Sequence, residues 1–83
     1  MNNNKNLITF YGYMLQYGIG VAYDKEEAIK FYKKGIDVGD PWAMNYYGFM
    51  YHNGNVVPVD VEKAIKYYKM AIDAGNEMAM NNY

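Results

Sequence analysis

Apolar residues recur every three or four positions along most of the chain, the spacing that places side chains on one face of an α-helix. Ala64, Tyr68 and Ile72 follow this spacing, whereas Lys66 and Asp73 fall on the opposite side. The pattern predicts helices over about residues 5–17, 24–38, 41–52, 60–75 and 77–83, separated by short segments that contain glycine. We therefore expect an all-α protein.

The central predicted helix has a clear start and a clear stop. Asp40 stands where a side-chain oxygen accepts from the free N–H groups of a first turn, and Pro41 suits a position that needs no N–H donor. Gly54 follows the helix and tolerates the left-handed conformation that ends it. This helix has a complete predicted helix on each side in the sequence, so we expect it to be the best-buried helix. A Gly48→Leu change should therefore unfold the domain.

The helices on either side carry most of the charge. Asp24 and Asp60 stand at their starts as caps, and Glu27, three residues after Asp24, completes the spacing of a capping box. Two pairs at i,i+4 spacing, Glu26/Lys30 and Glu62/Lys66, each contribute about 0.2–0.5 kcal/mol to helix stability. These charges predict a solvated outer face rather than a site of chemistry.

The chain repeats itself at an offset of 36 residues. Aligning residues 7–47 with 43–83 gives 19 identities in 41 positions without an insertion. Each unit is a helix A, a glycine-containing loop, a helix B and a tight turn. The repeated Gly12 and Gly48 lie inside helix A, where glycine costs about 1 kcal/mol, so they indicate close helix contact. We expect one domain over 1–83: a polar tail at 1–6, repeats at 7–42 and 43–78, and the start of a third helix A at 79–83.

Composition narrows the classes of function. The net charge is −1 and all the basic residues are lysines, which argues against a nucleic-acid partner. The chain has no cysteine, so it has no disulfide framework, and disulfide-free small domains are typical of an intracellular, cytoplasmic location. The polar N-terminus lacks the apolar core of a signal peptide, and no apolar run approaches the ~20 residues of a membrane span.

The repeat unit resembles the Sel1-like repeats, relatives of the tetratricopeptide repeats. The resemblance rests on the segment E-A-x-x-F-Y-K-x-G from Glu27 and on A-x-x-x-Y-G-x-x-Y-x-x-G from Ala43, with the loop V-x-x-D that ends at Asp60. It implies antiparallel helix pairs stacked into a right-handed solenoid, with a concave surface lined by helix A, and it implies a protein-interaction or adaptor role without catalysis. Gly35 stands where the family has alanine, so we expect a weaker first helix B.

Catalytic and metal-binding constellations are not evident. His52 is the single histidine, has no cysteine or second histidine as a partner, and is explained by the favourable C-terminal end of a helix. Gly18-Ile19-Gly20 follows a predicted helix rather than a strand, so it is no phosphate loop. The chain contains no serine. We expect no enzyme activity, no metal and no cofactor.

One surface is a candidate for partner binding. On the wheel of the central helix, Asn45, Phe49 and His52 lie opposite the expected core stripe of Ala43 and Tyr47. Their counterparts in the neighbouring repeats include Thr9, Tyr13 and Asn81. Amide and aromatic side chains in a row suit an extended peptide, because amides bond the peptide backbone and rings cover its side chains. The competing interpretation is an ordinary polar helix surface.

Two further hypotheses stay open. The predicted third helix A ends at a tyrosine of the core pattern, and solenoids usually need three or more repeats. One hypothesis is therefore a structural or truncated repeat unit that forms a homo-oligomer through its C-terminal end, with no separate ligand. A small enzyme or metal protein built around His52 is the remaining class. It predicts that a His52→Ala change has a functional effect.

Overall fold

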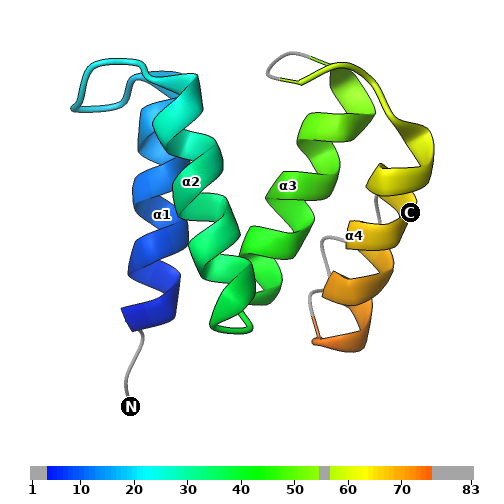
Figure 1. Ribbon diagram of the computed structural model, residues 1–83. Helices are drawn as coiled ribbons and strands as arrows, with labels where there is room; N and C mark the ends of the chain where they lie inside the picture. Colours follow the sequence, from blue (N-terminus) through cyan, green and yellow to red (C-terminus); the bar gives the residue numbers. More distant parts are fainter. Residues whose placement is uncertain (1–3, 55–56, 76–83) are drawn as a thin grey trace.

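A computed structural model describes residues 4–54 and 57–75, with side chains from residue 7 onward. Four helices follow in order, α1 (Asn4–Tyr17), α2 (Lys25–Asp37), α3 (Pro41–Asn53) and α4 (Val61–Asp73). Figure 1 shows them as two antiparallel hairpins side by side, with α3 next to α2. No strand occurs in the described ranges. The all-α helix-pair prediction is confirmed, and the predicted helix at 77–83 lies outside the described residues.

The helix boundaries agree with the caps predicted from the sequence, with one shift at the start. Asp40 Oδ1 accepts from Trp42 N at 3.1 Å, and Gly54 ends α3 with φ of 74°. Asp24 and Asp60 cap α2 and α4 by accepting from the third residue of each helix, at 3.1 Å in both cases. α1 begins at Asn4, inside the stretch expected to be a polar tail.

The charged pairs on the outer face differ from the prediction. Lys30 pairs with Glu27 at 3.3 Å rather than with Glu26, and Lys66 Nζ lies over the ring of Tyr67. The Glu27 carboxylate therefore faces Lys30. The backbone N–H of Asp24, which a capping box would present to it, donates to Leu15 O at 3.0 Å. The last turns of α1 thus supply an acceptor that the local sequence does not contain.

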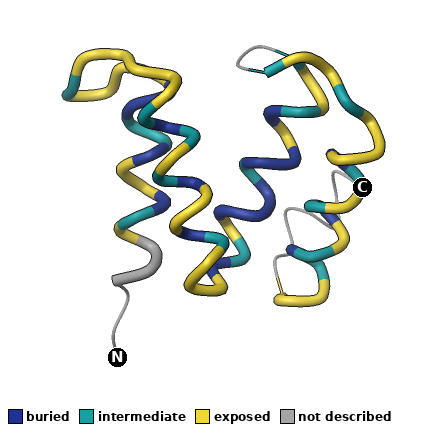
Figure 2. The backbone as a smooth tube through the Cα atoms, in the orientation of Figure 1, coloured by how far each residue is buried: buried dark blue, intermediate teal, exposed yellow. Residues whose placement is uncertain are grey.

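Over the described residues, α3 is the helix with the most buried residues, as expected. It contacts α1, α2 and α4 and has six buried residues, against three in each of α2 and α4. Figure 2 shows the dark blue of buried residues concentrated along α3. Two clusters meet on it: Tyr47 and Met50 pack with Tyr32 of α2, and Met44 packs with Tyr68 of α4. α3 therefore joins the two hairpins into one core.

Glycines inside helices mark the closest contacts between them. A Cβ on Gly48 would lie 3.0 Å from the Tyr68 ring and 3.1 Å from Ala64 O, and Gly12 has the equivalent contacts with α2. The predicted close approach is confirmed. Gly35 also has a packing reason, because a Cβ there would lie 2.6 Å from the Cβ of Ala43. The intrinsic cost of glycine in α2 is offset by this tight contact between α2 and α3.

Candidate functional site

The structure contradicts the expectation that Thr9 and Asn45 face outward. Thr9 is 2% exposed and Asn45 is 1% exposed. The Thr9 hydroxyl donates to Asp40 Oδ2, so it links α1 to the cap of α3. The helical wheel assumed one core-facing stripe, but α3 has neighbours on three sides, and each neighbour buries a further strip of its surface.

His52 is exposed and also has a packing partner. Its Nδ1 lies 3.3 Å from the hydroxyl of Tyr68. One repeat earlier, the Tyr32 hydroxyl donates to Gln16 Oε1 at 2.6 Å, and both positions differ by 36 residues. In each hairpin, the tyrosine of helix B thus bonds the last turn of helix A. This repeated contact gives His52 a packing role between α3 and α4.

Tyr13 and Phe49 are equivalent positions of α1 and α3, and both remain accessible. Tyr13 is half-buried and Phe49 is 36% exposed. The Phe49 ring meets the His52 ring edge to face at 6.3 Å. The structure therefore leaves these three predicted residues at the surface. The predicted Asn81 lies outside the described residues.

Sequence reasoning missed the aromatic residues that extend this surface. Ring contacts run from Tyr17 to Tyr13 at 4.8 Å, from Tyr13 to Tyr46 at 5.3 Å and from Tyr46 to Trp42 at 6.0 Å. We call these four residues the aromatic row; it crosses from α1 to α3. Tyr17 is 50% exposed and Trp42 is 40% exposed. The i,i+4 spacing within each pair was a usable signal, but the alignment of α1 beside α3 was needed to join the pairs.

The hydroxyl groups of the aromatic row lie close enough to influence each other. Burial raises the pKa of Tyr46, and the neighbouring Tyr13 and Tyr17 raise it further. Burial also raises the pKa of Tyr17, with a smaller contribution from Tyr13. Behind the row, burial raises the pKa of Tyr32 far above its usual value. Tyr17, Tyr32 and Tyr46 are therefore neutral hydrogen-bonding groups at physiological pH.

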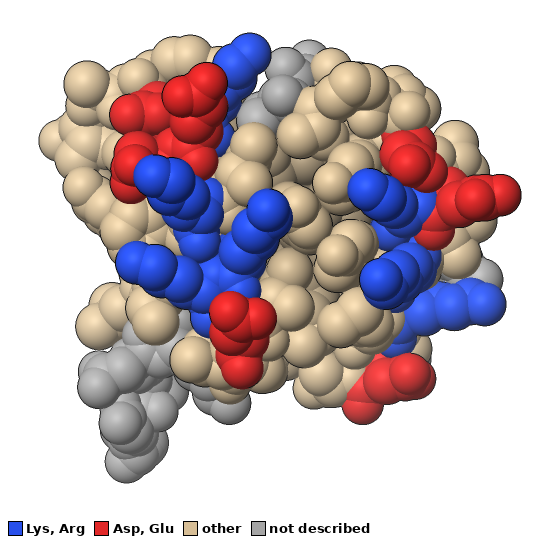
Figure 3. Space-filling view, in the orientation of Figure 1, with Lys and Arg blue, Asp and Glu red and all other residues tan. Residues whose placement is uncertain are grey.

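The two helices that carry the aromatic row, α1 and α3, have almost no charged residues. Beyond Lys5, α1 has no lysine, arginine, aspartate or glutamate, and α3 has none at all. Apart from Lys5, the lysines lie on α2 and α4, where Figure 3 shows two blue groups interspersed with acidic residues. The charge of Asp40 helps to raise the pKa of Tyr46, and Asp40 itself is fully buried. The helix-A side is thus an uncharged aromatic surface, while the helix-B side is charged.

Several features of other functional classes are missing from the part of the chain that the structure describes. No group of three or more histidine, cysteine or acidic side chains is placed to hold a metal ion there. Over the same residues, no helix is both long and apolar enough to cross a membrane.

The fold and its repeated contacts define the chain as a helix-pair repeat protein. The family model of the Sel1 repeat matches residues 8–40 and 43–76, and the chain belongs to the Sel1 repeat family. Proteins of this family generally act as non-enzymatic interaction modules. A comparison with curated protein sequences found no match.

Solved structures of similar proteins have the same fold. A Sel1 repeat protein from Oxalobacter formigenes is 35% identical, with a TM-score of 0.84 over 90% of this chain. The protective antigen c5321 of uropathogenic Escherichia coli strains, which displays an SLR fold, is 32% identical, with a TM-score of 0.82 over 90% of this chain. The chain spans 31% and 16% of the lengths of these two proteins.

Proposed function

We propose that this chain is a non-enzymatic interaction module that binds a peptide or protein segment across the concave face formed by α1 and α3. The observation that carries the proposal is the aromatic row, which lies on helices almost without charge. Tyrosine and tryptophan provide a large contact area with few rotatable bonds, which is why they are enriched at binding surfaces.

The chemistry of the row favours one kind of segment. Its tyrosine hydroxyl groups and the indole N–H of Trp42 can bond the backbone of an extended chain, while the ring faces cover apolar side chains. An acidic or basic segment would leave its charges against an uncharged surface and gain little there. We therefore expect a partner segment that is uncharged and contains apolar side chains.

The residues predicted from the sequence for this surface have two different roles in the proposal. Tyr13, Phe49 and His52 contact the partner directly. Thr9 and Asn45 do not contact the partner; they are buried and hold α1 and α3 in position. Asn81 stays a predicted contact.

A display experiment tests the proposal. Peptides are selected from a random library on the immobilised chain, and their affinity is then measured by calorimetry. A Tyr17→Ala/Trp42→Ala variant should lose at least about tenfold in affinity, the loss of ~1.4 kcal/mol expected from removing exposed aromatic contacts. The matched control, Lys30→Ala/Lys66→Ala, removes two side chains from the helix-B side and should leave affinity unchanged. Equal losses in both variants, or a loss only in the control, would place binding elsewhere.

Trp42 provides a second readout, because it is the single tryptophan of the chain. A selected peptide that covers the row should change the intensity or wavelength of Trp42 fluorescence. A peptide that binds with unchanged fluorescence contradicts binding at the row.

A further inference from the structure

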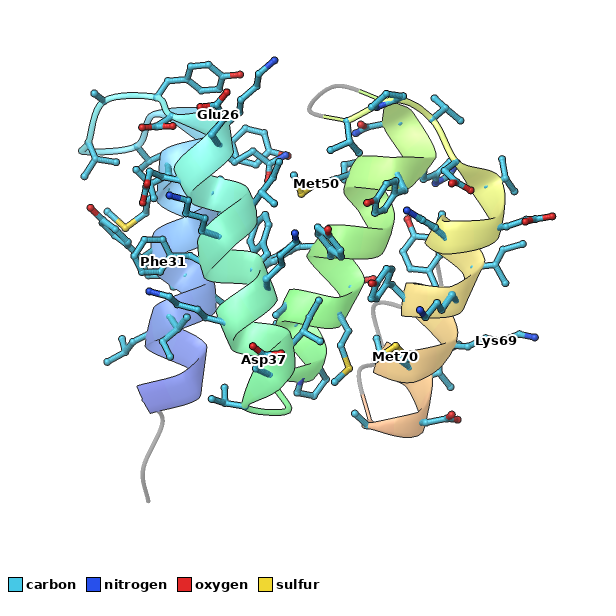
Figure 4. The ribbon with its side chains drawn as sticks, viewed as in Figure 1. Glu26, Phe31, Asp37, Met50, Lys69 and Met70 are labelled. Atoms are coloured by element: carbon cyan, nitrogen blue, oxygen red, sulfur yellow. The ribbon has the colours of Figure 1, made fainter. Side chains whose placement is uncertain are left out.

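The outer side of α1 carries an uncovered apolar stripe at the end of the solenoid. Leu7, Phe10 and Tyr11 are 62%, 57% and 40% exposed, and Met14 is half-buried. These four residues form what we call the end surface together with Phe31 of α2, whose ring meets the Tyr11 ring edge to face at 4.8 Å. Figure 4 shows Phe31 beside α1, on the side of the molecule away from α3 and α4. Contiguous exposed apolar surface of this kind usually marks an interaction site.

The equivalent surface of the second repeat is covered by a neighbouring helix. Tyr11 and Phe31 correspond, 36 residues later, to Tyr47 and Tyr67, whose rings also meet edge to face at 4.8 Å. There α2 packs against Tyr47, which is 5% exposed. Among the described helices, none takes the place beside Tyr11 that α2 takes beside Tyr47. The end surface therefore lacks the cover that its counterpart has.

The apolar residues of α1 are spaced evenly about the contact between Tyr11 and Phe31. Leu7 lies four residues before Tyr11 and Met14 three residues after it, so all three share one side of α1. A two-fold axis across this contact, perpendicular to α1, would lay Leu7 of each copy on Met14 of the other. Beyond Lys5, α1 has no lysine, arginine, aspartate or glutamate, so two such stripes meet without like charges.

The charged residues at the edge of the end surface follow the same spacing. Glu27 lies four residues before Phe31 and Lys34 three residues after it, on one side of α2. The Lys34 ammonium lies 4.8 Å from the centre of the Phe31 ring, and the side chain of Glu27 is 43% exposed beside Lys30. Because Tyr11 and Phe31 lie at the same level, the axis that pairs the apolar residues also brings Glu27 of each copy to Lys34 of the other.

We propose that the end surface binds the end surface of a second copy, in an antiparallel two-fold dimer centred on the contact between Tyr11 and Phe31. A second copy is the occupant because one axis matches the apolar pairs and the opposite charges together. In a two-fold contact the same patch serves both subunits, so each favourable pair occurs twice. The patch consists of one helix side and the edge of another, so the dimer belongs to the small, weak class of interfaces.

Exchanging the two charges tests the orientation of the copies. Lys34→Glu alone places like charges at both pairs, and so does Glu27→Lys, so each variant should dimerise about fivefold more weakly than the wild type. The double variant Glu27→Lys/Lys34→Glu restores opposite charges and should associate as the wild type does. An equal mixture of the two single variants should form a mixed dimer that is tighter than the dimer of either alone.

Recovery in the double variant requires that the two positions meet between copies. Within one copy they stand seven residues apart on α2, about 10 Å along the helix axis, which is too far for a direct pair. Any damage to α2 from the single changes would add up in the double variant. The matched control Lys33→Glu makes the same change of net charge as Lys34→Glu, at an exposed position two residues from Phe31 that does not face it, and should dimerise as the wild type does.

Analytical ultracentrifugation of the full chain from about 10 μM to 1 mM covers the affinities of weak interfaces. The wild type should gain mass with concentration up to a dimer and no further. Tyr11→Glu sets two carboxylates against each other at the axis and should stay monomeric. Tyr23→Glu, at a tyrosine that is 60% exposed in the loop before α2, should dimerise as the wild type does.

Circular dichroism confirms that each variant is folded, and the exposed charge variants keep the test decisive if Tyr11→Glu does not fold. A wild type that stays monomeric up to 1 mM overturns the proposal. Assembly beyond a dimer, dimers of folded Tyr11→Glu, or a double charge variant as weak as the single variants would each overturn it as well.

Discussion

Tyr11 and Tyr47 occupy the same position in the two repeats and meet the same kind of ring at the same distance, yet they differ in burial. Tyr11 is 40% exposed, and Tyr47 is 5% exposed. The difference comes from α2, which packs against Tyr47 from the neighbouring repeat, whereas no described helix takes the equivalent place beside Tyr11. In this solenoid, burial is therefore determined by a helix's place in the stack as well as by its sequence. Repeat proteins gain stability from contacts between neighbouring units in the same way.

The largest predicted difference in stability is that between the variants Tyr47→Ala and Tyr11→Ala. We expect Tyr47→Ala to lower the free energy of unfolding by about 4 kcal/mol, because it empties a packed site. Tyr11→Ala should cost about 1 kcal/mol, since its ring is already partly in water. Urea unfolding followed by circular dichroism measures both. Equal costs for the two variants would contradict the role assigned to α2.

The second comparison concerns the glycines of the two A helices. A Gly48→Leu change should cost about 3 kcal/mol, because the side chain would meet Ala64 O and the Tyr68 ring. Gly12→Leu introduces the same clash with α2, but α1 contacts only α2 and α3 among the described helices, so it can move away from them. We therefore expect a smaller cost, about 2 kcal/mol, in the same urea experiment. A larger cost at Gly12 would show that α1 is held as firmly as α3.

The third prediction tests the link between the repeats. Thr9→Val keeps the shape of the side chain but removes the hydroxyl that donates to the buried Asp40. We expect a loss of about 2 kcal/mol, the typical cost of depriving a buried acceptor of a partner. Thr9→Ser keeps the hydroxyl and is the control. If Thr9→Val is as stable as Thr9→Ser, the bond does not hold α1 to α3.

The smallest predicted effect is the contribution of the buried helix-B tyrosines to the loss of stability at alkaline pH. Burial raises the pKa of Tyr32, so the folded state favours the neutral phenol. Its contribution to stability is complete below about pH 10, the pKa of an unfolded tyrosine, and is lost as the pH rises toward the higher folded value. We expect this residue to contribute a loss of about 1 kcal/mol between pH 10 and pH 11.

Unfolding of Tyr32→Phe at pH 8, 10 and 11 checks the assignment. The variant starts less stable, because it lacks the bond to Gln16, but it should lose stability less steeply above pH 10. Tyr68→Phe changes the equivalent position, where burial also raises the pKa, so it too should lose stability less steeply than the wild type above pH 10. A Tyr32→Phe variant with the wild-type slope would show that burial of the Tyr32 hydroxyl does not cause the alkaline loss of stability.

Local features of this fold could be predicted from the sequence, whereas most contacts between particular helices could not. Asp40 and Gly54 act on the backbone within one turn of their own positions, so their roles as caps were visible from spacing alone. Gly48 was also predictable, because an internal glycine repeated at 36 residues indicates close packing. The prediction that Asn45 faces outward is wrong, because its burial depends on neighbouring helices that a helical wheel of α3 alone does not include.

The same limit applies to the candidate surface. Tyr13 and Phe49 could be predicted because the repeat relates them directly. The aromatic row could not, since Tyr13 meets Tyr46 only when α1 lies beside α3. From the sequence alone, Gly35 predicts only a less stable helix. Its close packing against Ala43 is visible only in the structure.

Native-state hydrogen exchange measures the difference between the two A helices most directly. The account predicts that the slowest amides lie in α3 and exchange only through global unfolding, whereas those of α1 exchange through a smaller opening that leaves α3 and α4 protected. Equal protection of α1 and α3, or greater protection of α1, would contradict the claim that a helix's place in the stack determines its burial and stability.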